Sequence, residues 1–524
     1  MPKFSLLTIV ITIIYLCLSF VFTKNALHMF QQQRYELRRY TKWLFNKRNI
    51  HFSFILIYVL LVLVIRIVVK TNIAYILYLL ITILFAIYYI YKENNKSYIK
   101  ELVITSRVKR QIVVMFVLLA YCFYNLIQDG SFALLSISSI YLPYLLIYVM
   151  AIITYPLEDL IKRHYEDDAR IILSKYDSLI KVGITGSFGK TSTKNIINDI
   201  ISKKYFTLIT PASYNTPMGI TRTVREYLKP VHEVFVCEMG ADKVGDISYL
   251  MKFVRPTYGI VTSIGPQHLN TFNTMNNIIK EKMQEIEMLP NNGVGIINID
   301  NEYIEKYQIT NRCKIVTVGI NNELADYRAT NIKYSKDGTS FKVKINKKNY
   351  SFKTSLLGQH NITNILSGIA LAIELNIDIK EIVDNVKNIN QVEHRLQLKK
   401  INNYTFIDDA FNSNPVGSKM ALDVLEMMPG KRIIVTPGMI DLGKKQNEYN
   451  YEFGKYMLNK TDYVLLVGEI QTKKIYQGLK DVNFDMEKVI VFKTVKEALM
   501  YVYSNFTSSD TILLENDLPD AFNV

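Results

Sequence analysis

The sequence predicts an all-α, membrane-spanning N-terminal region followed by α/β domains, and three observations support this. Long apolar runs recur through the first third of the 524 residues. A glycine-rich segment, GITGSFGKTS at 183–192, follows a short apolar stretch and precedes a helical pattern. Beyond it, apolar strand-like runs alternate with helical patterns, which is typical of α/β domains.

Five apolar runs approach the roughly 20 residues that a membrane span needs. They cover residues 4–22, 52–69, 73–91, 112–128 and 132–154. The first run could instead be a signal peptide, although no clear small-residue cleavage site follows it. We therefore expect a membrane domain of about five helices over 1–154 and a charged helical connector over 155–178.

The charge of the chain is concentrated in its N-terminal part. The net charge is +15, and residues 1–181 hold 21 Lys/Arg against 10 Asp/Glu, while the remainder holds 41 against 37. This distribution favours membrane topology and argues against a nucleic-acid partner. The four cysteines form no close pair, so we expect neither disulfides nor a zinc site.

Two long basic loops predict the orientation of these helices. Segment 23–51 holds seven Lys/Arg and segment 92–111 holds six, whereas the other two turns contain only Lys70 and Asp129 as charged residues. Basic loops remain in the cytoplasm. Five crossings would then place the N-terminus outside and residues from 155 onward inside. We expect a multi-pass cell-membrane protein, in contact with membrane lipids, whose C-terminal part is cytoplasmic.

The glycine-rich segment has the context of a phosphate-binding loop. LIKVGIT (179–185) predicts a buried strand and STKNIINDIISKKY (192–205) a helix, with Gly186 and Gly189 between them. Backbone N–H groups and the helix N-terminus would bind phosphates. Lys190 would contact the β and γ phosphates, and the Thr191 hydroxyl would hold Mg²⁺. The strict pattern requires glycine where Ile184 stands, so an ordinary glycine-rich turn remains the alternative.

Two further polar residues lie at predicted strand ends. VFVCEMGA (234–241) predicts a buried strand that ends at Glu238, and YGIVTSIGPQHLNTF (258–272) one that ends near His268. The carboxyl ends of strands in α/β sheets are where ligands bind. Taken alone, Glu238 could equally cap a helix and His268 could equally be a loop histidine.

Together these segments resemble the Mur ligase family, ATP-dependent enzymes that join amino acids or peptides to a carboxylate. The resemblance covers about 179–524 and implies a central ATP-binding P-loop α/β domain (179–390) and a Rossmann-like C-terminal α/β domain (391–524). Its further motifs are HNITNILSGIALA (360–372), EHRLQ and FIDDAFNSNP (406–415). The segments EMGADKVGDISYL and DDAFNSNP are similar in sequence to the corresponding segments of the D-alanyl-D-alanine-adding ligases in this family.

The resemblance implies roles for particular residues. The nucleotide would be bound by Gly186, Ser187, Gly189, Lys190, Thr191, Ser192, Asn361, Asn364, Arg395 and Asp409. Magnesium would be held by Thr191, Glu238 and His268. Lys190, His268 and Lys282 would be catalytic, and many relatives carry a carbamoylated lysine at the place of Lys282. A solvated helix lysine is the open alternative for Lys282.

The implied function is a membrane-bound, ATP- and Mg²⁺-dependent carbon–nitrogen ligase of the acid–amino acid class. It would form an acyl phosphate on a carboxylate of a cell-envelope precursor and couple an amino acid or dipeptide. A lipid-linked precursor and envelope-synthesis partners are both left open. One alternative is a membrane-anchored D-alanyl-D-alanine-adding peptidoglycan ligase. Another is a membrane transporter or regulator with a non-catalytic nucleotide-binding domain.

Several segments depart from the family pattern or stand outside its motifs. Apolar spans replace the family's small soluble N-terminal domain, and LLENDLPD and TPGMIDLG differ from the usual forms. These departures leave the acceptor and the amine open.

Residues 313–357 predict short strands, which we interpret as an excursion inside the central domain.

Overall fold

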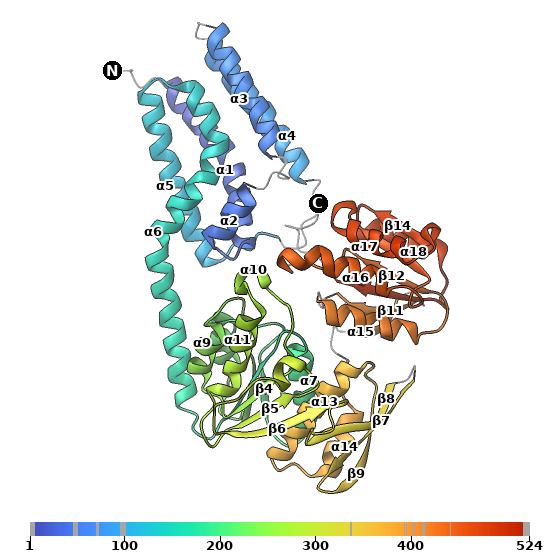
Figure 1. Ribbon diagram of the computed structural model, residues 1–524. Coiled ribbons are helices and arrows are strands. Elements are labelled where there is room, and N and C mark those ends of the chain that lie inside the picture. The colour runs from blue at the N-terminus through green and yellow to red at the C-terminus, as the bar shows by residue number, and fades with distance from the viewer. Residues whose placement is uncertain are drawn as a thin grey trace. The chain divides into compact units, whose positions relative to one another are not determined.

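The computed structural model divides into two compact units, Met1–Arg163 and His164–Leu518 (Figure 1). The structure describes residues 6–45, 51–69, 73–94, 101–335, 338–391, 394, 396–401, 404–410, 414–440 and 442–516.

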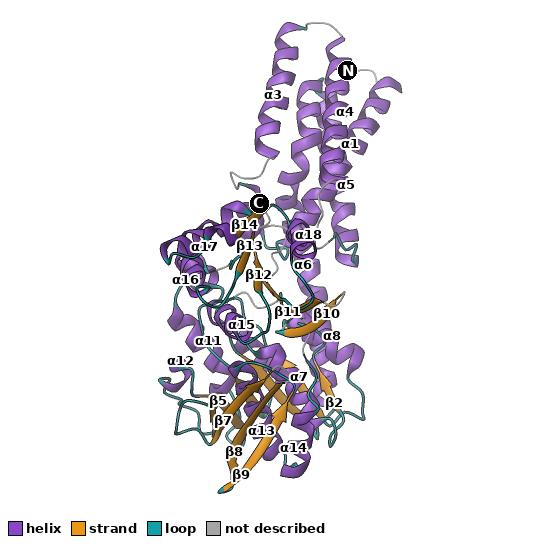
Figure 2. Ribbon diagram, turned by 90° about the vertical axis from the view of Figure 1, so that its right-hand side faces the viewer, coloured by secondary structure: helices purple, strands orange, loops and turns teal. Residues whose placement is uncertain are grey.

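In the described residues of the first unit every regular element is a helix, and the strands belong to the second unit (Figure 2). Its helices are α1 (Leu6–Gln32), α2 (Leu37–Leu44), α3 (His51–Val68), α4 (Ile73–Asn94), α5 (Ser106–Gln128) and α6 (Phe132–Ser174). Each of the five predicted apolar runs thus coincides with a helix. Among the residues that the structure describes, four helices are long and apolar enough to cross a membrane, and the apolar part of α3, Ile57–Val68, is shorter.

Helix α6 is longer than the predicted apolar run, because it continues through the predicted connector as far as Ser174. Its last turns belong to the second unit. Ala169 and Leu173 are buried in the same hydrophobic cluster as Phe235 and Ile247 of the central domain. The charged residues of this segment therefore surround a narrow apolar face, as expected for an amphipathic helix.

The central domain is built on a nine-stranded sheet of order β2-β3-β1-β4-β5-β6-β7-β8-β9. Strands β1 to β7 pair in parallel, and β7, β8 and β9 form an antiparallel meander. The strands are β1 (Ile180–Thr185), β2 (Thr207–Ile209), β3 (Val234–Glu238), β4 (Tyr258–Val261), β5 (Val294–Asn298), β6 (Lys314–Gly319), β7 (Tyr327–Ser335), β8 (Gly338–Ile345) and β9 (Lys348–Thr354).

The sheet corrects the interpretation of residues 313–357. The predicted strands are present, but they are not an excursion: β6 pairs with β5, and β7 joins β6 through Val318–Tyr327 and Gly319–Arg328. They extend the central sheet itself. Alternation of buried and exposed side chains along β8 explains why the strands could be predicted, whereas their attachment to β5 depends on long-range pairing.

Helices cover both faces of this sheet. They are α7 (Lys190–Ile201), α8 (Pro217–Tyr227), α9 (Asp246–Val254), α10 (Leu269–Phe272), α11 (Met275–Glu287), α12 (Glu302–Glu305), α13 (Gln359–Glu374) and α14 (Ile379–Lys387). One core cluster joins α7 and α13 to the strands through residues such as Ile197, Ile200 and Ile365. A second cluster includes α9 and α11. Helix α7 is thus fixed by its apolar face, which positions its N-terminus.

The C-terminal domain contains a six-stranded sheet of order β10-β11-β15-β12-β13-β14. Its strands are β10 (Gln397–Ile401), β11 (Tyr404–Asp409), β12 (Arg432–Thr436), β13 (Tyr463–Val467), β14 (Val489–Phe492) and β15 (Thr511–Glu515). Its helices are α15 (Pro415–Glu426), α16 (Gln446–Tyr456), α17 (Glu469–Asp481) and α18 (Val495–Asn505), with single turns at Gly443–Lys445 and Met486–Lys488. The alternation of strands and helices agrees with the predicted α/β domain, and the edge strand β10 differs from the rest in being antiparallel to its neighbour β11.

Two glycines allow α16 and α17 to pack closely. A Cβ atom at Gly454 of α16 would lie 2.3 Å from the carbonyl oxygen of Ile475, and one at Gly478 of α17 would lie 2.2 Å from that of Tyr451. Each helix therefore presents a glycine to the backbone of the other. Since backbone atoms cannot move aside as a flexible side chain can, no larger residue fits at either position.

We expect Gly454→Ala to destabilise the C-terminal domain by about 1–3 kcal/mol, because the added methyl group must separate the helices. The exposed Lys473→Ala, also on α17, serves as the control and should change the unfolding free energy by less than about 0.5 kcal/mol. Urea-induced unfolding of the two variants measures the difference. Equal stability of both variants would show that the helices do not pack through these glycines.

Candidate active site

The glycine-rich segment lies between the end of β1 and the start of α7. Gly186 has φ 152° and Gly189, the N-cap of α7, has φ 83°, a left-handed conformation that glycine adopts without steric cost. A Cβ atom at Gly186 would lie 2.1 Å from Thr262 Oγ1. The loop therefore requires glycine at both positions, and it leaves the first amides of α7 directed out of the sheet edge.

The loop is held by several hydrogen bonds to the segment that directly follows strand β4. The Ser187 amide donates to the Ser263 carbonyl at 2.7 Å, and the Ser187 hydroxyl donates to the Gly265 carbonyl at 2.9 Å. The Thr262 hydroxyl donates to the Phe188 carbonyl at 2.6 Å. These contacts bring the segment that leads to His268 beside the loop.

Ile184 departs from the phosphate-loop pattern for a structural reason. It lies inside β1, is fully buried, and has Glu238 of β3 and Ile260 of β4 as its pairing partners. The turn away from the strand begins only at Gly186. The loop is therefore shorter than the strict pattern, and its helix begins at Lys190.

Lys190 lies over the loop that precedes it. Its Nζ donates to the carbonyl of Gly186 at 2.7 Å and to that of Ser187 at 3.3 Å. An ammonium group at this place, together with the N-terminus of α7, provides the positive charge that anionic phosphates require. Ser192, also predicted to contact the nucleotide, is buried in the first turn of α7.

Glu238 is the centre of a buried polar cluster at the end of β3. It is 1% exposed. Its Oε2 accepts hydrogen bonds from the Thr191 hydroxyl at 3.0 Å and from the Lys194 ammonium at 3.2 Å. Its Oε1 accepts from the side-chain amide of Asn215 at 3.0 Å. The structure thus brings Thr191 and Glu238 together as predicted, and it adds Lys194 and Asn215, which the sequence analysis did not select.

The partners of Glu238 decide its charge. Burial alone would raise the pKa of this carboxyl, but the ammonium groups of Lys194 and Lys190, with the hydrogen bonds from Asn215 and Thr191, lower it below its ordinary value. Lys194 is itself 1% exposed and also donates to the Ala212 carbonyl at 2.6 Å. Glu238 is therefore ionised at neutral pH, directly beside the phosphate loop.

Lys282 lies on α11 and is 1% exposed, so the alternative of a solvated helix lysine does not fit. Its Nζ has no hydrogen-bond partner among the described residues. Burial lowers the pKa of Lys282 to about 7, and the charge of Lys190 acts in the same direction. A buried amine without a partner, close to neutral at physiological pH, is available for reaction with a small electrophile.

One turn further along α11, Glu285 is fully buried, and neither of its carboxyl oxygens has a hydrogen-bond partner in the described part of the chain. Burial raises the pKa of Glu285 to about 8, against the opposing effect of the Lys282 charge. A Cβ atom at Gly183 of β1 would lie 1.9 Å from Glu285 Oε1. Glu285 was not predicted, because nothing in the sequence separates it from its acidic neighbours Glu281 and Glu287.

His268 starts helix α10 with a left-handed φ of 52°. Its Nε2 lies 3.3 Å from Asp242 Oδ1, in the segment that follows β3. The structure thus places His268 beside the acidic residue four positions after Glu238. Its predicted roles in catalysis and metal binding stay predictions.

The other predicted nucleotide contacts border an open cavity of about 240 Å³. Gly189, Ser192, Asn364 and Asp409 line it, and the Nδ2 of Asn364 is buried without a hydrogen-bond partner in the described residues. Asn361 does not line this cavity, because its Nδ2 donates to the Leu357 carbonyl at 2.8 Å.

Asp409 reaches the cavity from the C-terminal domain and is held in place by its backbone neighbours. Its Oδ1 accepts from the Leu396 amide at 3.0 Å. The predicted Arg395 lies outside the described residues. The adjacent Asp408 was not predicted; its Oδ2 lies 2.8 Å from His394 Nδ1 and 2.6 Å from Lys399 Nζ.

A second cavity, of about 570 Å³, adjoins the first through Asp300, Asn301 and Val416. Lys419 of α15 and Glu448 of α16 also line it. Residues of both the central and the C-terminal domain line each cavity, so that the two cavities lie in the cleft between these domains.

The residues present fit a nucleotide and one divalent cation. Across the described ranges, no three His, Cys, Asp or Glu side chains gather into a metal-binding group. Magnesium, however, is commonly held by one carboxylate with phosphate oxygens and waters. The ionised Glu238 and the hydroxyl of Thr191 supply the protein ligands of such a site, and the partnerless Asn364 amide and Lys282 amine are polar groups that ligands would satisfy.

The buried Glu285 makes a specific contribution to the pH dependence of stability. Its pKa is about 8 in the folded chain, against an ordinary glutamate value of 4.5, so the folded state binds one more proton than the unfolded state between these values. The contribution of Glu285 to the free energy of unfolding therefore decreases as pH rises from 5 to 8. We expect Glu285→Gln to gain unfolding temperature relative to the parent chain as pH rises through this window.

Thermal unfolding from pH 5 to pH 9, without metal or bicarbonate, measures this difference. The exposed Glu305→Gln is the matched control and should follow the parent chain at every pH. A constant difference between Glu285→Gln and the parent would show that Glu285 is ionised in the folded protein.

Comparison with known proteins agrees with this geometry. Residues 184–372 match the Mur ligase middle domain, and residues 394–515 match the Mur ligase glutamate ligase domain. The chain is 30% identical over 276 residues to UDP-N-acetylmuramoyl-tripeptide--D-alanyl-D-alanine ligase of Escherichia coli, covering 52% of this chain but only 61% of that protein. The Bacillus subtilis enzyme of the same name is 27% identical over 338 residues, covering 64% and 72%.

Solved structures show the same fold. MurF from Acinetobacter baumannii superposes with a TM-score of 0.62 at 23% identity, covering 69% of this chain and 78% of that one. MurF ligase from Thermotoga maritima in complex with ADP gives a TM-score of 0.62 at 22% identity, covering 69% and 81%. The two domain matches together span more than half of the chain, which therefore belongs to the Mur ligase family, a family of ATP-dependent acid–amino acid ligases.

Proposed function

We propose that the chain is an ATP-dependent ligase that joins the amine of an amino acid or dipeptide to a carboxylate of a cell-envelope precursor. The names of the most similar curated relatives favour the D-alanyl-D-alanine-adding reaction. The observation that carries the proposal is the buried cluster in which Thr191, Lys194 and Asn215 hold an ionised Glu238 beside the phosphate loop.

The reaction requires two anions to meet. The acceptor carboxylate attacks the γ phosphate of ATP to give an acyl phosphate, and an amine then displaces phosphate to form the amide. Lys190 and the N-terminus of α7 offset the phosphate charge, which lowers the barrier to this approach. A magnesium ion bound at Thr191 and Glu238 would supply further charge neutralisation.

Lys282 has the properties that carbamoylation requires. Addition of its neutral amine to CO₂ gives a carbamate and releases one proton, and the low pKa of the buried amine supplies the neutral form near pH 7. The carbamate would place a new anionic group close to the charge of Lys190. We propose that it serves as an additional oxygen ligand for the metal.

The cleft between the domains suits the remaining substrates. The cavity beside the nucleotide site presents Lys419 and Glu448, an exposed cation and an exposed anion. An amino acid or dipeptide carries the complementary carboxylate and ammonium groups. We propose that the amine substrate binds here, adjacent to the acyl phosphate.

We further propose that the protein is a multi-pass membrane protein with a cytoplasmic ligase part. The supporting observation is that the first unit contains four long apolar helices, all of which begin before the family matches at residue 184. This arrangement favours a second candidate for the acceptor, namely a lipid-linked carboxylate precursor. Anchoring in an envelope-synthesis complex would also account for the helices.

The ligase proposal is tested with the full chain in nanodiscs, ATP and D-alanyl-D-alanine. One assay supplies soluble UDP-muramyl tripeptide and another supplies a lipid-linked carboxylated glycan. We expect acceptor-dependent ADP release and amide formation with at least one of them, and the productive acceptor identifies the substrate class. Lys190→Ala should reduce the rate by at least about a hundredfold, because it removes the charge that stabilises the transferring phosphate. The exposed Lys203→Ala is the control, and equal rates in both variants would refute the phosphate-loop assignment.

The membrane orientation is tested by single cysteines in a cysteine-free background. Because the basic loop around residue 95 should be cytoplasmic, a cysteine there should be shielded from an impermeant thiol reagent in intact cells. A cysteine at position 130, between α5 and α6, should react. The reverse pattern would place the ligase part outside the cell, where ATP is absent.

A further inference from the structure

Arg107, in the first turn of α5, has a charge that the described residues satisfy only in part. Its guanidinium lies over the ring of Tyr35, 3.9 Å from the ring centroid. Its Nε is buried and has no hydrogen-bond partner in the described part of the chain. The contact with Glu158 is long, since Arg107 Nε and Glu158 Oε2 are 3.9 Å apart, beyond hydrogen-bond distance.

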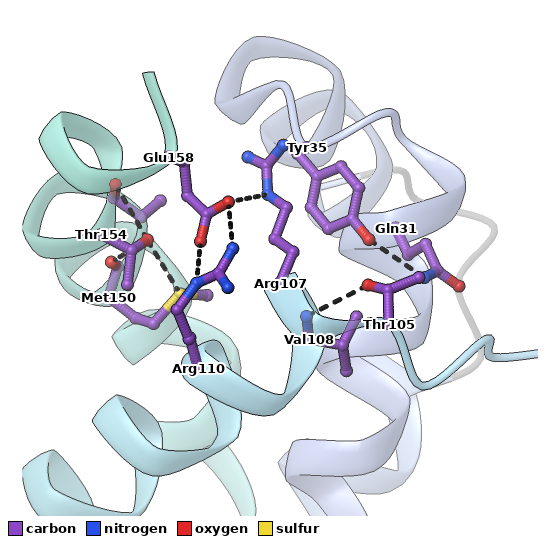
Figure 3. A network of polar contacts seen from close by, with 10 residues as sticks. Gln31, Tyr35, Thr105, Arg107, Val108, Arg110, Met150, Thr154 and Glu158 are labelled. Atoms are coloured by element: carbon purple, nitrogen blue, oxygen red, sulfur yellow. Dashed lines mark hydrogen bonds and ion pairs between the residues drawn. The ribbon is translucent and has the colours of Figure 1, made fainter. Parts of the chain in front are cut away.

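The carboxylate of Glu158 is already bound by a different arginine. Arg110 donates from Nε to Oε1 at 2.8 Å and from NH2 to Oε2 at 2.9 Å, a bidentate pair (Figure 3). One carboxylate thus faces two guanidinium groups. Arg110 neutralises the Glu158 carboxylate through two short hydrogen bonds. The same carboxylate therefore does not also neutralise the positive charge of Arg107. The Arg107 side chain is 38% exposed, so a ligand can reach it.

The surrounding chain fixes Arg107 in this position. Gln31, at the end of α1, binds the backbone of Val103 through both its side-chain oxygen and its nitrogen, and also donates to the Tyr35 hydroxyl. Thr105 caps α5 by accepting from the Val108 amide at 3.3 Å. Figure 3 shows the Gln31–Tyr35 and Thr105–Val108 contacts near the guanidinium. Since the site is ordered before any ligand arrives, binding costs little conformational entropy.

Apolar side chains adjoin this partly satisfied charge. Val103 and Ile104, which precede the N-cap Thr105 of α5, are 62% and 52% exposed. Val113 and Val117, further along α5, are also exposed. Helix α5 is one of the four helices long and apolar enough to span a membrane, and Arg107 stands at its first turn. A ligand for this place needs acceptor oxygens for the guanidinium and an apolar part for the adjoining surface.

We propose that Arg107 and Tyr35 form a binding site for the phosphate or diphosphate group of a membrane lipid. Phosphate oxygens match the planar fork of a guanidinium, and the stacked ring holds this fork in one orientation. The proposal rests on the membrane placement given under the proposed function, but not on the ligase reaction. A bilayer phospholipid and a lipid-linked precursor share this chemistry.

Native mass spectrometry of the full chain, released from detergent micelles, tests the site. The added probes are phosphatidic acid, diacylglycerol with the same acyl chains, farnesyl diphosphate and inorganic pyrophosphate. We expect the chain to retain phosphatidic acid or farnesyl diphosphate but not diacylglycerol. Arg107→Gln should lower this retention by about tenfold, the effect of losing a charge-assisted pair. The more strongly retained of the two probes identifies the natural class of lipid.

Two variants separate the site from general charge. Lys109→Gln removes an exposed positive charge two residues away and should change retention less than twofold. Arg107→Lys keeps the positive charge but not the planar guanidinium. Its lipid retention should lie between that of the parent chain and that of Arg107→Gln. Fluorescence of Trp43, the single tryptophan of the chain, and unchanged ADP affinity verify that the variants are folded.

Equal retention by the parent and Arg107→Gln, or equal losses in Arg107→Gln and Lys109→Gln, would overturn the proposal. Binding of pyrophosphate alone, with neither lipid retained, would also overturn it, since the site would then take a free phosphate compound. Lipid retention through Arg107 without ligase activity would refute the proposed function and leave this site standing. Ligation without Arg107-dependent lipid retention would support the proposed function and refute this site.

Discussion

An ionised carboxylate, Glu238, is held in the interior of the central domain, and the arrangement of the phosphate loop depends on what keeps it charged. Without partners a carboxylate in this place would be neutral. Lys194 supplies the opposite charge, and Asn215 and Thr191 supply hydrogen bonds. A buried ion pair that loses one member is typically destabilised by about 3–5 kcal/mol. The cluster is therefore both a structural element of the domain and the source of a negative group where phosphates and a cation would meet.

The order of the sheet explains why these groups lie together. Strand β1 is flanked by β3 and β4, so that the phosphate loop emerges between the strand that ends at Glu238 and the strand that leads to His268. Helix α11 packs in the hydrophobic cluster that contains Cys237 and Met239, and Lys282 and Glu285 project from it into the interior. Their interior positions make one an amine with a lowered pKa and the other a carboxyl with a raised pKa. In both cases burial disfavours the charged form of the side chain.

Sequence reasoning identified the residues whose spacing carries chemistry. Gly186, Gly189, Lys190 and Thr191 follow from the loop pattern, and Glu238 follows from its place at a strand end. It did not select Lys194, because Lys194 resembles the exposed Lys203 in the same predicted helical segment. It did not select Glu285, because Glu285 resembles its acidic neighbours. Burial of these side chains is decided by how α7 and α11 face the sheet. The attachment of β7 to β6 and the edge strand β10 likewise depend on long-range pairing that local patterns do not encode.

We infer that the loop at 186–191 binds nucleotide phosphates together with a cation held by Glu238. This binding is measured by calorimetric titration of the full chain in detergent with ADP, in the presence and absence of Mg²⁺. We expect Mg²⁺ to tighten ADP binding by at least about tenfold in the parent chain. Glu238→Gln should abolish this gain while binding without metal persists. An equal gain from Mg²⁺ in both proteins, or no ADP binding at all, would show that Glu238 and the loop do not form such a site.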